Sequence, residues 1–180
     1  VQRVFNQNIM SRILVTGHKG FIGSHLMPML ADYDTVGMDL RDGKDLLLFR
    51  NELDQQVFGS DVVIHLAAKV GQGDKGDFIR HNVLGTAAVC EAVDKYKKKL
   101  IYASSAAIYE PTVSPYAQSK TLAEQIVQKV MWTNRVTILR FFNVYGVGMN
   151  PNYGSVMWNF IRGVYEGVLP INGDGKQTRD

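Results

Sequence analysis

The stretch Ile13-Leu14-Val15-Thr16-Gly17-His18-Lys19-Gly20-Phe21-Ile22-Gly23 decides the fold of this 180-residue chain. It has the pattern of a buried strand, a glycine turn and the start of a helix. Gly17 permits the tight turn, Gly20 lets a ligand come close to the backbone, and Gly23 lets the helix pack on the strand. Such a turn brings backbone N–H groups and a helix N-terminus together, so we expect it to hold a pyrophosphate.

A carboxylate follows the next apolar stretch at the distance that a dinucleotide site requires. Asp39 ends the run at residues 35–39, about twenty residues after the glycine turn begins. A dinucleotide-binding fold places near this point the carboxylate that holds the adenosine ribose hydroxyls. The alternative, a structural turn followed by a surface aspartate, is disfavoured by the combination of the two features.

Short apolar runs alternate with longer amphipathic stretches along the chain, which predicts βαβ units and a parallel sheet. We expect strands at residues 12–16, 35–39, 61–66, 99–104 and 136–141, and helices at 21–32, 46–58, 75–96, 116–132 and 155–166. Pro28 lies inside the first helix and should kink it or shift its start. The predicted fold is α/β, a Rossmann-like, doubly wound parallel sheet with helices on both faces.

The composition, with 46% hydrophobic and 21% charged residues, is that of an ordinary globular protein with one core. The lysines at 95 and 97–99 lie at the end of an expected helix, where the helix dipole favours cations, so we do not expect a nucleic-acid surface. The single cysteine, Cys90, excludes an internal disulfide and indicates a reducing compartment. The four histidines have no cysteine partners, and no apolar run approaches the length of a membrane span. We therefore expect a cytoplasmic protein without a metal site, a nucleic-acid partner or a membrane partner.

Ligands of an open parallel sheet bind beyond the carboxyl ends of its strands, so the residues after each expected strand are site candidates. The third strand leads into Leu66-Ala67-Ala68-Lys69. The small alanines would let a cofactor lie against the backbone, but close helix–sheet packing would select the same residues. Asn82 is a polar residue on an otherwise core-facing helix. It is either a bridge between strand ends or an exposed amide.

The fourth expected strand ends in Ala103-Ser104-Ser105, and the next helix carries Tyr116 and Lys120 on one face. An ammonium beside a phenol favours the phenolate and lowers a pKa that is normally near 10. A phenol tuned in this way can act as a general base towards an alcohol, while a serine hydroxyl polarises the same oxygen. A tyrosine and a lysine at this spacing often form only a surface contact, but here they follow a glycine turn and a strand-end serine.

Together these motifs resemble the extended short-chain dehydrogenase/reductases, the family of NAD-dependent nucleotide-sugar epimerases and dehydratases. The segment Arg140-Phe141-Phe142-Asn143-Val144-Tyr145-Gly146 and the closing run at 173–180 also match, so the likeness covers nearly everything from Met10 onward. The resemblance implies NAD as the cofactor, a nucleotide-sugar as the substrate, and a homodimer built from the helices at 75–96 and 116–132.

The resemblance also implies a role for each matching residue. Ser105 would hydrogen-bond the reacting oxygen, Tyr116 would exchange its proton, and Lys120 would lower the tyrosine pKa and hold the nicotinamide ribose. Asp39 would favour NAD over NADP, a preference that Arg41 tempers. The implied cofactor-binding set is Gly17, Gly20, Phe21, Ile22, Gly23, Asp39, Leu40, Asp45, Leu46, Leu66, Ala67, Ala68, Asn82, Ala103, Ser104, Tyr116, Lys120 and Phe142. The implied substrate-binding set is Lys69, Ser105, Asn143 and Arg179.

Ala106 and Ala107 narrow the implied reaction. Dehydratases of the family carry an Asp-Glu pair after the catalytic hydroxyl, related decarboxylases use a Glu in this stretch, and the fucose-pathway epimerase-reductases use a Cys at the position of Ala107. What remains needs only hydride and hydroxyl-proton transfer, which fits 4-epimerisation of a UDP-sugar through a 4-keto intermediate. Two alternatives stay open: an NAD(P)-dependent reductase of a keto-sugar or small carbonyl compound, and a catalytically silent dinucleotide-binding module.

The resemblance divides the chain into three parts. Residues 1–9 are expected to be an N-terminal extension before a natural start at Met10, and residues 10–149 the NAD-binding Rossmann domain. Residues 150–180 would be the start of a small substrate lobe, because the family continues beyond this point.

Overall fold

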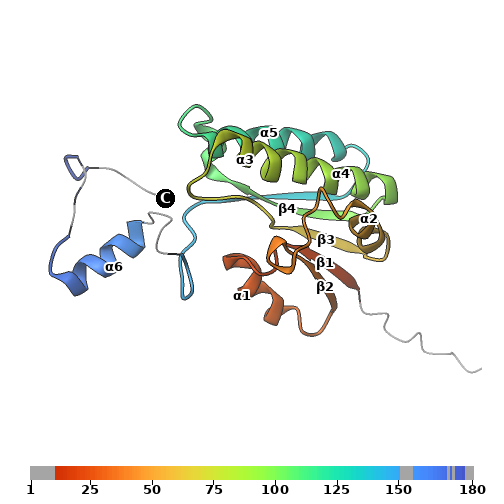
Figure 1. Ribbon diagram of the computed structural model, residues 1–180, viewed down its shortest axis with the longest axis horizontal. Coiled ribbons are helices and arrows are strands. Elements are labelled where there is room, and N and C mark those ends of the chain that lie inside the picture. The colour runs from red at the N-terminus through yellow and green to blue at the C-terminus, as the bar shows by residue number, and fades with distance from the viewer. Residues whose placement is uncertain (1–10, 151–155, 170, 172, 177–180) are drawn as a thin grey trace, which may run out of the picture.

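Five parallel strands form one sheet in the computed structural model, which describes residues 11–150, 156–169, 171 and 173–176 (Figure 1). The strands are β1 (Arg12–Thr16), β2 (Asp34–Met38), β3 (Val62–His65), β4 (Lys99–Ser105) and β5 (Val136–Phe141). Their order across the sheet is β2-β1-β3-β4-β5, with every neighbouring pair parallel. The order reverses between β1 and β3, and this is where an open parallel sheet forms its ligand crevice. The predicted Rossmann-like fold is confirmed.

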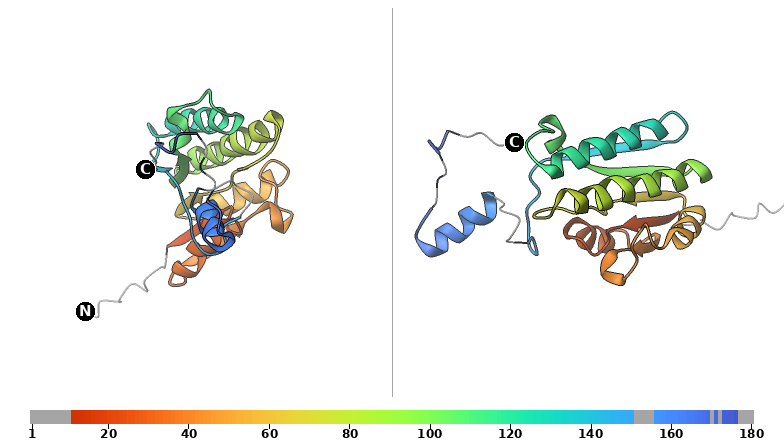
Figure 2. Two further views of the ribbon diagram at one scale, coloured as in Figure 1. Left: turned by 90° about the vertical axis from the view of Figure 1, so that its left-hand side faces the viewer. Right: turned by 45° about the horizontal axis from the view of Figure 1, so that its top comes forward.

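Helices cover both faces of the sheet because each central strand is apolar on both sides (Figures 1 and 2). Ile13 and Val15 of β1 face α1 (Phe21–Met29), and Leu14 between them faces the opposite layer. That opposite layer contains α2 (Arg50–Phe58), α4 (Gly85–Tyr96) and α5 (Pro115–Val130). Its core centres on Tyr102 and Leu100, both fully buried. The alternation of side chains along β1 therefore produces the two-sided packing.

The helix expected at 116–132 is α5, which ends two residues earlier, and two other helices differ more from the prediction at one end. Pro28 does not shift the start of α1, which begins at Phe21 as expected, but the helix ends at Met29 instead of at residue 32. The helix expected from residue 46 begins only at Arg50. Asp45 is the reason, because its carboxylate accepts the N–H of Leu47 and its carbonyl accepts the N–H groups at 48 and 49. This turn occupies residues 45–49, so α2 starts only after it.

The helix expected at 75–96 is divided into three segments. They are α3 (Lys75–Phe78), a π-helical segment η2 (Ile79–Leu84) and α4. A π turn contains one more residue than an α turn and is frequent at functional sites. Here it contains Asn82, whose side chain is buried.

The remaining helices lie on the side where the strands end. Two short 3-10 segments, η1 (Leu40–Asp42) and η3 (Ala106–Tyr109), follow β2 and β4. The helix α6 (Val156–Glu166) stands apart from the sheet on that side (Figure 1). None of the helices within the described ranges is long and apolar enough to cross a membrane. The expected N-terminal extension at 1–9 and Arg179 lie outside the described residues, and the predicted domain boundaries stay predictions.

Candidate cofactor and active site

The glycine loop between β1 and α1 packs directly on the loop that follows β3. Gly17 has a φ of +75°, and a Cβ at this position would come within 2.6 Å of the backbone nitrogen of Ala67. A Cβ at Gly23 would overlap with the carbonyl oxygen of Gly17. The loop is held by hydrogen bonds from the Gly20 N–H to the Gly17 carbonyl and from the Gly17 N–H to the Met38 carbonyl, at 3.0 and 2.8 Å. Two of the three glycines are thus required by close backbone packing.

A cleft of about 560 Å³ opens beside this loop, at the switch point between β1 and β3. Most of the predicted cofactor residues line it: Gly17, Gly20, Phe21, Ile22, Gly23, Asp39, Leu40, Asp45, Leu46, Leu66, Ala67 and Ala68, together with Lys69 from the predicted substrate set. The sequence analysis missed the lining residues Met38, Lys44, Leu47, Val70, Arg80, His81 and Gly85. Most of these flank residues that were predicted, so inspection of the whole connecting loops would have found them.

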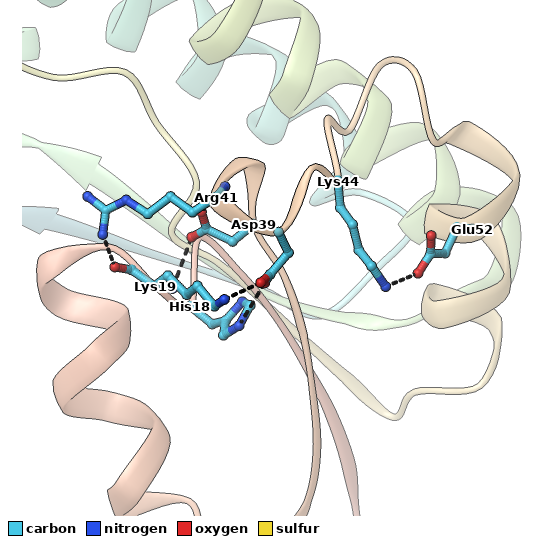
Figure 3. Close-up of polar contacts among 7 residues, drawn as sticks. His18, Lys19, Asp39, Arg41, Lys44 and Glu52 are labelled. Carbon is cyan, nitrogen blue, oxygen red and sulfur yellow. Dashed lines mark hydrogen bonds and ion pairs between the residues drawn. The ribbon is translucent and has the colours of Figure 1, made fainter.

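Asp39 is held in the cleft by the backbone on both sides of it. One carboxylate oxygen accepts the N–H of Lys19 in the glycine loop, and the other accepts the N–H of Arg41, both at 2.9 Å (Figure 3). The residue is only 8% exposed. A carboxylate offers about four lone-pair sites, so acceptor capacity remains for two ribose hydroxyls. The position and the free acceptors of Asp39 suit the adenosine ribose.

Asn82 is a buried bridge and not an exposed amide, which resolves the two alternatives that the sequence left open. Its Oδ1 accepts the N–H of Lys69 at 2.7 Å. Its Nδ2 donates to the Lys69 carbonyl at 3.0 Å and to the Ser119 hydroxyl at 2.9 Å. Asn82 therefore connects the end of the cleft to α5, the helix that carries Tyr116 and Lys120.

The three predicted catalytic residues lie at the end of β4 and at the start of α5. Ser114 caps α5 by accepting the N–H of Ala117 at 3.1 Å, which places Tyr116 in the first turn of the helix. Burial raises the pKa of Tyr116, and the side chain of Ser105 opposes that increase. None of the three predicted catalytic residues belongs to the lining of the cleft, which includes Lys69 and Val70 after β3.

Lys120 differs from the prediction in the partner that it contacts. The residue is 3% exposed, and its amine donates to the hydroxyl of Tyr102 at 2.8 Å and to the carbonyl of Ala103 at 2.7 Å. Burial lowers the pKa of Lys120 to about 7, against an opposing influence of Glu124. The predicted lowering of the Tyr116 pKa by Lys120 is wrong for this structure, because burial raises that pKa and the amine contacts Tyr102 instead.

The other predicted site residues are dispersed. The Ser104 hydroxyl donates to Glu124, which also forms a 2.7 Å ion pair with Arg140, so it belongs to a buried network and not to the cleft. Phe142 and Asn143 are exposed just after β5. Six predicted cofactor-binding residues thus lie outside the lining of the cleft: Asn82, Ala103, Ser104, Tyr116, Lys120 and Phe142.

Fold and site together define an extended short-chain dehydrogenase/reductase. The chain belongs to the NAD dependent epimerase/dehydratase family, whose model matches residues 13–180. The cofactor predicted from the sequence, NAD, is confirmed as the cofactor of the family. The residues present fit it, since Gly17, Gly20 and Gly23 line the cleft at the start of α1 and Asp39 keeps free acceptors. Among the described residues no group of three or more His, Cys, Asp or Glu side chains could hold a metal ion.

Similar proteins include enzymes that act on nucleotide-sugars. The chain is 30% identical to the UDP-N-acetyl-alpha-D-glucosaminuronate decarboxylase of Bacillus cytotoxicus, over 93% of this chain and 66% of that protein. It is 34% identical to the putative UDP-glucose 4-epimerase of Methanocaldococcus jannaschii, over 93% of this chain and 68% of that protein. The crystal structure of the UDP-glucuronic acid 4-epimerase from Bacillus cereus in complex with NAD superimposes with a TM-score of 0.79 at 30% identity, covering 92% of this chain and 66% of that one. The chain thus spans about two thirds of the length of these relatives.

Proposed function

We propose that this chain carries the cofactor-binding and catalytic part of an NAD-dependent nucleotide-sugar 4-epimerase, with a UDP-sugar as substrate and a 4-keto intermediate. The observation that carries the proposal is the position of Ser105 at the end of β4 and of Tyr116 in the first turn of α5, the helix that Asn82 connects to the cleft of the glycine loop. No acidic residue follows Ser105 in η3, whose sequence is Ala-Ala-Ile-Tyr.

Tyr116 is the proposed general base and acid. It takes the proton of the C4 hydroxyl as that carbon loses a hydride, and it returns the proton when the hydride returns to the opposite face of the sugar. Bound NAD supplies the acceptor and donor of that hydride. Ser105 donates a hydrogen bond to the same oxygen, which stabilises the charge that develops there. Its Oγ accepts the N–H of Ala107 at 3.2 Å, so the hydroxyl proton remains available.

Lys120 is proposed to position the cofactor. A protonated amine has three donors, and two of them are used by Tyr102 and Ala103. The third donor is available for a ribose hydroxyl. With its pKa lowered to about 7, Lys120 carries only part of a charge at neutral pH in this structure. A ligand that accepts a hydrogen bond from the amine favours the protonated form, because the hydrogen bond stabilises that form.

Elimination of water requires an acid that protonates the departing hydroxyl, and η3 offers only Ala106 and Ala107 at the corresponding place. Decarboxylation is the second candidate function, because a relative with 30% identity is a decarboxylase. A 4-keto uronic acid is a β-keto acid and can lose carbon dioxide after the same oxidation. The two reactions share the first step and differ in their products.

Product analysis tests the proposal. The purified chain is incubated with UDP-glucose or UDP-glucuronic acid and catalytic NAD. Chromatography separates the C4 epimer from the substrate, and mass spectrometry detects a decarboxylated product. The C4 epimer with no net change in the cofactor supports epimerisation, whereas a pentose product with carbon dioxide indicates decarboxylation. In a parallel incubation with a keto-sugar and NADPH, stoichiometric consumption of the reduced cofactor indicates a reductase. NAD binding without turnover in either incubation indicates a silent binding module.

A pair of tyrosine variants tests the general base. Tyr116→Phe should lower turnover by about 10²- to 10⁴-fold, the range for loss of a general acid–base group, with NAD binding retained. The control is Tyr33→Phe, which removes a hydroxyl from the exposed turn before β2 and should leave turnover unchanged. Equal turnover of both variants contradicts the role of Tyr116.

We further propose that two chains associate through α4 and α5. Leu122 of α5 and Leu84, just before α4, are exposed apolar side chains on these helices. Sedimentation of the purified chain as a monomer at micromolar concentration would contradict this association. A cytoplasmic location stays a prediction.

A further inference from the structure

The amine of Lys120 is held inside the protein by two groups of β4, the strand along which α5 packs (Figure 1). One is the carbonyl of Ala103, and the other is the hydroxyl of Tyr102, which accepts from the amine at 2.8 Å. The nitrogen also lies 4.4 Å from the centre of the Tyr102 ring. Both side chains are buried. Because a buried ammonium needs acceptors, these contacts decide where the amine lies.

A chain of buried polar side chains holds Tyr102 from behind. The Thr86 hydroxyl forms a hydrogen bond with that of Tyr102 and lies 3.0 Å from Nε2 of His65. Nδ1 of His65 lies 2.6 Å from the hydroxyl of Thr16, and the imidazole stacks on the Tyr102 ring with centroids 5.6 Å apart. In a neutral imidazole one ring nitrogen donates and the other accepts. The chain runs from β1 through β3 and α4 to β4, and it restricts the orientation of the Tyr102 hydroxyl.

The titratable side chains around Lys120 and Tyr102 come from several elements: His65 of β3, Arg140 of β5, Cys90 of α4, and Tyr116 and Glu124 of α5. Burial raises the pKa of the two phenols and of the thiol, and it lowers the pKa of His65 to about 3, so these groups are neutral at pH 7. The carboxylate of Glu124 raises the pKa of Lys120 but forms its ion pair with Arg140. The direct partners of the amine are therefore neutral acceptors, and Tyr102 is the one that a substitution can remove.

We propose that Tyr102 is a positioning residue: its hydroxyl, oriented by Thr86, fixes the Lys120 amine in the place from which Lys120 binds the cofactor. A neutral phenol accepts a hydrogen bond from the ammonium and stabilises its charge without cancelling it. A carboxylate in the same place would form an ion pair and compete with a ribose hydroxyl for the amine. This inference rests on the proposed role of Lys120 toward the cofactor and adds Tyr102, which the sequence analysis did not include among the site residues.

The protonation of Lys120 tests the proposal without cofactor or turnover. The chain is labelled with ¹³C at the lysine Cε atoms, and NMR follows the Lys120 signal, assigned by its loss in Lys120→Met, from pH 5 to pH 9. Burial lowers the pKa of Lys120 to about 7, so the signal should titrate near pH 7. Tyr102→Phe keeps the ring and removes the acceptor, so the midpoint should fall by about one pH unit, a tenfold loss of proton affinity.

Two other variants complete the titration. The control is Tyr96→Phe, which removes a half-buried hydroxyl that contacts Asp54 at 3.4 Å outside the site and should leave the Lys120 midpoint unchanged. Thr86→Val keeps the acceptor of the amine but removes the hydroxyl that orients it, so the midpoint should fall by less than in Tyr102→Phe. Thr86→Val also provides the test if Tyr102→Phe does not fold, which far-ultraviolet circular dichroism checks first.

Calorimetric titration of NAD at two pH values separates positioning from simple packing. The protonated amine is the better donor to a ribose, so NAD affinity should fall as the pH rises through the Lys120 midpoint. A variant with a lower midpoint loses this donor earlier. Tyr102→Phe should therefore bind NAD within about twofold of the unsubstituted chain at pH 6 and at least about fivefold more weakly at pH 7.5. Tyr96→Phe should stay within about twofold at both.

The results that overturn the proposal are separate from those that overturn the sugar reaction. An unchanged Lys120 midpoint in Tyr102→Phe, or in Thr86→Val if the former does not fold, removes the positioning role. Equal weakening of NAD by Tyr102→Phe at pH 6 and pH 7.5 also overturns it, because that result assigns the residue to packing alone. The NMR titration needs neither NAD nor a sugar, so it decides the role of Tyr102 even if the chain proves to catalyse a different reaction.

Discussion

Replacing Asn82 with alanine should destabilise the protein and loosen the end of the cofactor cleft. Asn82 is 1% exposed and makes three hydrogen bonds, two with the backbone of Lys69 and one with Ser119. Its removal leaves the N–H and the carbonyl of Lys69 without these partners, and a buried group without a partner costs about 1–3 kcal/mol. Water in the cleft can reach part of the Lys69 backbone, so the expected loss in the free energy of unfolding is about 2–4 kcal/mol.

Urea denaturation of Asn82→Ala measures this loss, and amide hydrogen exchange at Lys69 reports the loosened loop. The matched control is Asn51→Ala on the exposed side of α2, where the same chemical change should alter the free energy of unfolding by less than about 0.5 kcal/mol. NAD affinity should fall in Asn82→Ala and remain unchanged in the control. A loss below about 0.5 kcal/mol for Asn82→Ala, with unchanged exchange at Lys69, would refute the bridging role.

Three other predictions follow from buried or strained groups. Burial lowers the pKa of His65 to about 3, so the folded protein holds this residue neutral. Since the unfolded chain takes up a proton at this residue below pH 6.5, the free energy of unfolding should fall there by up to about 1.4 kcal/mol per pH unit. Denaturation at pH 7.5, 6 and 5, compared with His65→Gln, checks the slope. Glu124→Gln weakens a buried charged network and should cost about 1–3 kcal/mol by denaturation, against less than 1 kcal/mol for Glu52→Gln, whose lysine partner is on the surface. Gly17→Ala and Gly43→Ala both force a side chain to positive φ, but only the new Cβ at position 17 meets backbone atoms. Gly43→Ala should therefore lower the free energy of unfolding by about 1–2 kcal/mol, and Gly17→Ala should lower it clearly more. Equal melting temperatures of the two variants would contradict the packing of the glycine loop.

The sequence was sufficient for the parts of the site that depend on short stretches of chain. Gly17 and Gly23 are needed by backbone packing within one strand–turn–helix unit, so their spacing identifies the unit. Asp39 was predicted for a similar reason, since it directly follows the next strand and lies beside the glycine loop through parallel pairing of β1 with β2. Local periodicity also located the five strands within one or two residues, because parallel strands that are buried on both faces form continuous apolar runs.

The sequence did not predict those contacts in which a side chain binds a residue from another element of the fold. The spacing of Tyr116 and Lys120 places both on one helix face, but it does not show that the hydroxyl of Tyr102 offers a closer acceptor to the amine. Similarly, the π-helical segment around Asn82 has no signal in its own residues. It places the amide group of Asn82 against the backbone of Lys69, on the loop that follows β3. Both features depend on contacts between distant segments.

The helix α5 shows why stability and position are coupled in this site. An amphipathic helix normally buries apolar side chains, yet α5 buries Ser119, Lys120 and Glu124, each 3% exposed or less. A buried polar side chain is tolerated only with a partner, and these three find theirs on other elements, in Asn82, in Tyr102 and in Ser104.

Each of these hydrogen bonds connects α5 to a different part of the site. Ser119 also donates to the carbonyl of Tyr116 at 2.7 Å, so the contact with Asn82 is transmitted to the backbone of the proposed general base. An apolar replacement of these residues could pack as well and would leave the helix free to slide or rotate against β4. The polar contacts restrict α5 to one register, because any shift would leave several buried groups without partners at about 1–3 kcal/mol each. The position of Tyr116 relative to the cofactor cleft is therefore determined by the buried polar face of α5 more than by its apolar packing.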